Sequence, residues 1–155
     1  GEDKTTLGEK ARAITGFYMR GCKDAVRLCP AAREEGLHAE ESLRRAMEET
    51  LEALGNPPAP EKKAGKVPQR TLKGPIIHLE DMPREDEEKK QAYKAYEEQY
   101  RKGCPDAMLF ETLLLFAMDR ERTLEECVRL AQLEAGTGSQ EMAEAFLKIL
   151  DITLK

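Results

Sequence analysis

The chain has 155 residues and a mass of 17.5 kDa, which predicts one domain and excludes two large ones. Charged residues make up 35% of it, aromatic residues only 5%, and tryptophan is absent. Sheet proteins use more β-branched and aromatic residues, so this balance favours helices with solvated faces. We therefore predict an all-α fold, a helical bundle of about six to seven helices.

Several classes of protein conflict with these properties. The longest apolar run, residues 107–118, is interrupted by Glu111 and Thr112, whereas a membrane span needs about 20 apolar residues. The first residues carry no signal-peptide pattern, so we expect a cytoplasmic protein without a membrane span. A pI near 5.3 argues against general binding to nucleic acid, which needs a concentrated positive surface.

Apolar spacing predicts two helices in residues 5–54. In the first of these, Leu7, Ala11, Ile14 and Tyr18 share one face, and Thr6 with Glu9 predicts a capping box at its start. The second helix is expected over residues 39–54. Between them Pro30 removes a backbone donor, so residues 23–35 are expected to form two short turns.

Residues 55–84 predict a Pro-rich arm, because they hold six of the eight prolines. Residues 55–79 carry a charge of +4, against −2 for residues 1–54 and −7 for residues 80–155. An apolar patch at residues 75–79 could pack on the bundle or form a short strand. The arm's candidate interaction residues are Lys62, Lys63, Lys66, Arg70, Lys73, Ile76, Ile77 and Leu79.

The second half, residues 85–155, shows periodic segments at residues 85–102, 105–118, 123–135 and 140–154. Thr123 with Glu126 predicts a capping box, and Gly136 followed by Ser139 predicts the end of one helix and the cap of the next. Tyr93, Tyr96 and Tyr100 form a stripe on one helix. Such a stripe is typical of a core face with hydroxyls at its rim, and an interaction surface is the alternative.

Two segments resemble each other closely enough to suggest an internal duplication. Residues 18–26 and 100–108 share five of nine residues, and residues 39–46 and 124–131 share four of eight in the same order. We therefore consider two three-helix units, residues 5–54 and 85–155, the second extended by a closing helix. The alternative is that helices rich in Ala, Glu, Leu and Arg resemble one another by chance.

The four cysteines, at positions 22, 29, 104 and 127, lack the spacing of a zinc site. In a duplicated fold Cys22 and Cys104 would occupy equivalent turns at helix N-termini, where the helix dipole lowers the pKa of a thiol. They are the candidate thiols, and a role as small buried fillers is the alternative.

Paired glutamates lack the Glu-x-x-His partner of di-metal bundles. We predict no metal, no cofactor and no catalytic residue.

These observations favour a non-enzymatic module that binds another protein or a second copy of itself, with the basic arm as one route to self-association. Two alternatives stay open. The first is a thiol-dependent redox sensor or enzyme using Cys22 or Cys104. The second is an acidic inhibitor that occupies the basic cleft of a nucleic-acid-binding protein.

Overall fold

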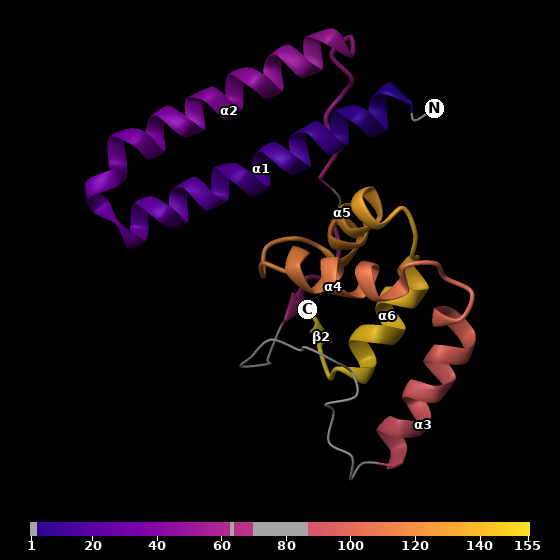
Figure 1. Ribbon diagram of the computed structural model, residues 1–155. Helices are drawn as coiled ribbons and strands as arrows, with labels where there is room; N and C mark the ends of the chain where they lie inside the picture. The colour runs from indigo at the N-terminus through magenta and orange to yellow at the C-terminus, as the bar shows by residue number, and fades with distance from the viewer. Residues whose placement is uncertain (1–2, 63, 70–86) are drawn as a thin grey trace. The chain divides into compact units, whose positions relative to one another are not determined.

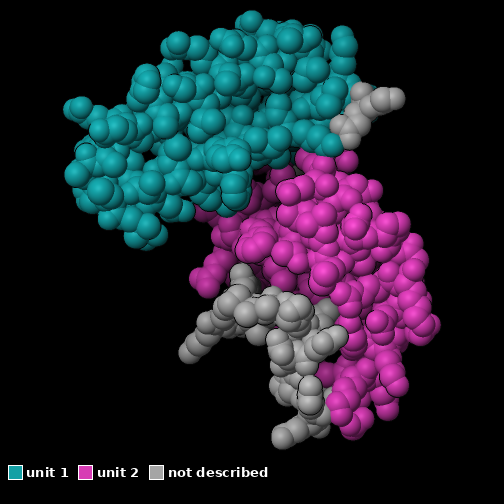
Figure 2. Space-filling view, viewed as in Figure 1, with its two compact units in different colours: residues 1–61 teal, residues 62–155 magenta. Residues whose placement is uncertain are grey.

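The computed structural model describes residues 3–62, 64–69 and 87–155, and it divides into two compact units, residues 1–61 and 62–155 (Figure 2). Apart from one pair of two-residue strands, the regular structure described is helical. The predicted all-α fold is confirmed.

The first unit is a hairpin of two long antiparallel helices, α1 (Lys4–Leu28) and α2 (Arg33–Ala53), joined by the 3-10 turn η1 (Pro30–Ala32) (Figure 1). The two short turns predicted over residues 23–35 are wrong, since α1 continues to Leu28 and α2 begins at Arg33. Pro30 removes a donor only at the start of η1, where none is needed. The second helix also begins six residues earlier than predicted, at Arg33 instead of position 39.

The cap of α1 differs from the predicted box of Thr6 and Glu9. Asp3, which is extended, accepts a hydrogen bond at Oδ1 from the backbone N–H of Thr6 at 2.8 Å. Asp3 is therefore the N-cap, and Thr6 already lies in the first turn. The chain after α2 folds back onto α1, where Arg12 donates to the carbonyl of Pro57 at 2.6 Å and of Pro58 at 3.2 Å.

The second unit consists of α3 (Glu87–Tyr96), the π-helical turn η3 (Glu97–Arg101), α4 (Ala107–Ala117), α5 (Leu124–Ala135) and α6 (Gln140–Ile149) (Figure 1). Its predicted cap signals are confirmed. Thr123 and Glu126 form the reciprocal capping box of α5, Gly136 ends that helix at φ 68°, and Ser139 caps α6. The core is centred on fully buried side chains of α4, α5 and α6, namely Phe110, Leu114, Cys127, Phe146 and Leu147.

Two short strands close the second unit. β1 (Pro68–Gln69) pairs antiparallel with β2 (Thr153–Leu154), and Pro68 lies opposite Leu154. The helix predicted over residues 140–154 is therefore too long, because α6 ends at Ile149 and Asp151 turns the chain at φ 53°. The segment before β1 is also bonded to α5, since the carbonyl of Lys66 accepts a hydrogen bond from the backbone N–H of Leu124 at 2.9 Å.

Among the described residues, none of the helices combines the length and apolar character that crossing a membrane requires.

Candidate functional site

The predicted tyrosine stripe lies on the core side of the second unit. Tyr96 is only 3% exposed, and its ring centroid lies 6.0 Å from that of Phe146. Tyr93 and Tyr100 are half-buried against the same core. Tyr96 is thus not accessible to a partner. Of this stripe, the folded unit exposes parts of the Tyr93 and Tyr100 side chains.

The stripe leads to a buried polar cluster that sequence inspection missed. Glu111 of α4 is 4% exposed and accepts a hydrogen bond at Oε1 from the Tyr96 hydroxyl at 2.8 Å. Arg101 places Nε 3.3 Å from the same oxygen and donates from Nη1 to the Tyr93 hydroxyl at 2.5 Å. A glutamate inside an apolar run was the available signal, but its partners lie 10 and 15 residues earlier.

Burial dominates the electrostatics of this cluster. It raises the pKa of the Glu111 carboxyl, while the hydrogen bond from Tyr96 and the charge of Arg101 act in the opposite direction. It also raises the pKa of the Tyr96 hydroxyl, and the neighbouring Glu111 adds to that rise. Through its Oε1 atom, the Glu111 carboxylate links Tyr96 of α3 and Arg101 of η3 to α4.

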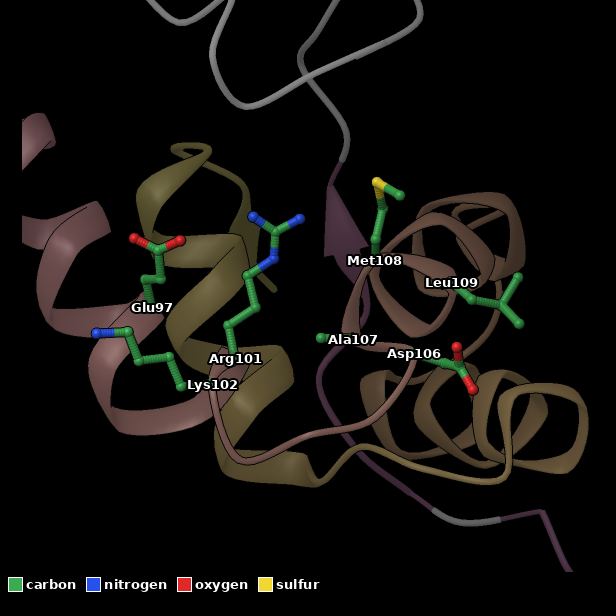
Figure 3. A pocket seen from close by; sticks show the side chains of 7 residues that line it. All are labelled: Glu97, Arg101, Lys102, Asp106, Ala107, Met108 and Leu109. Atoms are coloured by element: carbon green, nitrogen blue, oxygen red, sulfur yellow. The ribbon is translucent and has the colours of Figure 1, made fainter.

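A hollow of about 450 Å³ opens beside Arg101 (Figure 3). Figure 3 shows side chains of η3 and of the following Lys102 on one side of it and the start of α4 on the other. Its lining carries two acidic and two basic side chains, but no thiol, hydroxyl or imidazole: Glu97, Arg101, Lys102, Asp106, Ala107, Met108 and Leu109. This set offers no nucleophile with an adjacent base, and none of the described residues forms a three-ligand group for a metal.

The thiols occupy four different environments. Cys22 lies inside α1 and not in a helix-start turn, so it is not equivalent in local structure to Cys104, which precedes α4. The Sγ of Cys104 lies 2.9 Å from the Thr137 hydroxyl. Burial raises the pKa of the Cys127 thiol to about 12, whereas Cys29 is exposed. The duplication and a thiol-dependent activity both stay predictions.

The candidate residues of the arm fall into two groups. Lys62 is exposed, and the segment that holds Lys66 is fixed to α5 and β2 by backbone hydrogen bonds. The remaining candidates lie outside the described residues: Lys63, Arg70, Lys73, Ile76, Ile77 and Leu79.

The hairpin carries an apolar surface that is not covered. Among its described residues, 3–61, only Gly8, Thr15 and Pro57 are buried. The predicted apolar face of α1 is instead exposed, with Ile14 at 58%, Tyr18 at 57% and the adjacent Phe17 at 75%. Leu7 and Leu28 extend this surface toward the two ends of the helix. Large apolar side chains gathered in this way are typical of an interaction site.

The face that α1 turns toward α2 is offset from the predicted one by a single position. Val26 lies against Gly36, where a Cβ would come within 2.2 Å of its Cγ2. Moving back along α1 in steps of four and three gives Cys22, Met19, Thr15, Arg12 and Gly8, all half-buried or buried. We call these six positions the hairpin seam. Apart from Met19 and Val26 its residues are small or polar, and the more apolar stripe beside it has no partner inside the hairpin.

No protein-family model matches this chain, and comparisons with curated proteins and with solved structures found no match either. Its own geometry is therefore the guide to its function.

Proposed function

We propose that this protein is a non-enzymatic protein-interaction module and that the α1–α2 hairpin is its docking element. The observation that supports this is the exposed surface of α1. A helix of 25 residues presents Leu7, Ile14, Phe17, Tyr18 and Leu28 to solvent. Packing of an apolar face supplies most of the stability of a helix in a protein, so an unpaired face of this size favours a partner.

The rest of the described structure agrees with a binding role. The buried Tyr96 and Glu111 and the half-buried Arg101 interact with one another, and the lining of the neighbouring hollow has no nucleophile with an adjacent base. Self-association through the arm of residues 55–84 remains a separate proposal. Replacing residues 71–85 with a neutral Gly/Ser linker tests it by sedimentation, and loss of an oligomer would support it.

The docking proposal is tested by a photo-reactive phenylalanine analogue placed at position 14 of the full chain in its native host. Leu37 provides the matched control, because it is an exposed apolar residue of the same hairpin on α2, at 57% exposure against 58% for Ile14. Position 14 is expected to give a covalent adduct with a second polypeptide, and position 37 is expected to give little. Equal yields at both positions, or no adduct with a second polypeptide at position 14, would contradict the proposal.

A further inference from the structure

The exposed stripe of α1 follows a strict heptad pattern. Its positions are separated by four and three residues in alternation: Leu7, Ala11, Ile14, Tyr18, Gly21, Ala25 and Leu28. The first six of these residues each come one position before a residue of the hairpin seam. Leu28 continues the same spacing beyond the last seam residue. The stripe is therefore continuous with the interface that α1 already makes with α2, rotated from it by about 100°. In a four-helix bundle, a helix uses two such adjacent faces for its two neighbours.

The same side of the hairpin carries a stripe of small residues on α2. Because α1 and α2 are antiparallel, the position before each seam residue lies on the same face of the hairpin in both helices. On α2 the seam runs through half-buried residues such as Gly36, Leu43 and Met47. The preceding positions begin with Glu35 and continue as a second stripe, of small residues: Ala39, Ser42, Ala46, Thr50 and Ala53.

The two hydroxyls in that stripe are already satisfied by their own helix. Ser42 donates to the carbonyl of His38 at 2.9 Å, and Thr50 donates to the carbonyl of Ala46 at 2.8 Å. These two hydroxyls therefore do not need a hydrogen-bond partner from a neighbouring helix. One face of the hairpin thus has four large side chains on α1, at Leu7, Ile14, Tyr18 and Leu28, and mostly small ones on α2.

Charge is divided between the same two helices. Within Lys4–Leu28, six basic residues and two acidic ones give +4. Within Arg33–Ala53, three basic residues and seven acidic ones give −4. A partner that matches this face must place an acidic helix with small residues over α1 and a basic helix with large residues over α2. The face of a second copy has this arrangement.

We propose that two copies of this chain pair through this face, forming a four-helix bundle in which each α1 packs on the partner's α2. This inference rests on the proposed interaction function. The proposed pairing has its two-fold axis parallel to the helices, since the perpendicular axis within the interface would place α1 on α1, positive against positive. A face about 35 Å long and about 20 Å wide covers about 700 Å² per partner, close to the usual size of a specific interface.

Sedimentation of the full chain over a range of concentrations tests the pairing. Ile14→Glu puts a charge in the large stripe, and Ala46→Arg puts a bulky cation in the small one. Each is expected to weaken dimerisation at least about 100-fold, because both copies lose contacts. Leu37→Glu, on the opposite face, is expected to change it less than about threefold. Circular dichroism checks that each variant retains its helices.

The direction of the axis is tested at Cys29, which is exposed beside the turn between the helices. The parallel axis brings both turns to one end, with the two Cys29 residues about 14 Å apart across the bundle. In the variant Cys22→Ala with Cys104→Ser, a bis-maleimide of that reach is expected to link two chains. Cys127 stays in place, because its thiol is buried and its pKa is raised to about 12.

Two results would overturn the inference. One is a wild-type chain that stays monomeric at the highest concentration, and the other is a dimer that resists both Ile14→Glu and Ala46→Arg. A dimer sensitive to both variants but not linked at Cys29 would overturn the proposed axis. If the chain is monomeric while position 14 still labels a foreign protein, the interaction function stands and self-pairing fails. If position 14 labels only residues 62–155 of its own chain, both proposals fail.

Discussion

The two units of this chain use amphipathic helices in opposite ways. In residues 62–155, α4, α5 and α6 bury their apolar side chains around Phe110 and Phe146, which are 0% and 2% exposed. In residues 1–61, α1 and α2 are about twice as long, yet Phe17 and Ile14 stay exposed. Two helices alone cannot enclose a core, whereas helices that cross in a bundle can. The second unit therefore encloses a core of its own, whereas the first leaves large apolar side chains exposed, which is the basis of the proposed pairing.

The largest expected effect comes from replacing a phenylalanine with alanine, in the second unit and, for comparison, in the first. Phe110→Ala leaves a cavity in the core and should lower the free energy of unfolding by about 4 kcal/mol. Phe17→Ala should change it by less than about 0.5 kcal/mol in the monomer, because that ring is 75% exposed. Urea titrations followed by tyrosine fluorescence and circular dichroism measure the two variants. Similar losses would mean that the hairpin has a core of its own.

A second comparison uses two glycines of the loop between α5 and α6. Gly138 has φ +97°, and a Cβ there would lie 2.3 Å from Cδ2 of Phe110. Gly138→Ala should therefore cost about 3 kcal/mol through strain and a clash with the core. Gly136 has φ +68° but open space around it, so Gly136→Ala should cost only about 1 kcal/mol. Equal melting temperatures for the two variants would show that Phe110 moves aside without cost.

A third prediction concerns the polar cluster inside the second unit. Tyr96→Phe removes the only hydroxyl described within hydrogen-bond distance of Glu111, and should cost about 1–3 kcal/mol because the carboxyl stays buried. Tyr100→Phe is the control, since its hydroxyl only accepts from Gln99 at 3.1 Å at the surface. That variant should lose less than about 0.5 kcal/mol. Thermal unfolding at neutral pH compares them.

Local signals in the sequence predicted much of this structure. The capping box of Thr123 and Glu126 and the helix boundary at Gly136 and Ser139 were found because each involves residues only three positions apart. The cap of α1 was misplaced because Thr6 also fits the pattern, and only the extended backbone of Asp3 distinguishes the two. Helical spacing likewise indicated the number and order of the helices.

Features that depend on distant residues could not be predicted. Two heptad stripes lie side by side on α1, and the spacing of Ile14 and Tyr18 cannot tell which stripe faces α2. Close approach of Gly36 to Val26 selects the less apolar one. Glu111 could not be paired with Tyr96 and Arg101, nor β1 with β2, before the chain was folded. The candidate interaction residues therefore lie on the arm and on the tyrosine stripe, and the exposed side chains of α1 are not among them.

The smallest expected effect is a pH dependence that belongs to the second unit alone. Burial raises the pKa of Glu111 above its ordinary value, so the folded unit binds that proton more tightly than the unfolded chain does. As pH rises from about 4.3, the ordinary pKa of glutamate, through the raised value, this group's contribution to the free energy of unfolding must fall.

The variant Glu111→Gln tests this, because its side chain cannot titrate and keeps an acceptor for Tyr96. The stability of the wild type minus that of Glu111→Gln should therefore decrease between pH 4 and pH 7. Urea titrations at each pH measure this difference, which the other carboxylates do not affect because both proteins share them. A difference that increases with pH would mean that Arg101 outweighs burial, and Glu111 would then stabilise the unit as an ion pair.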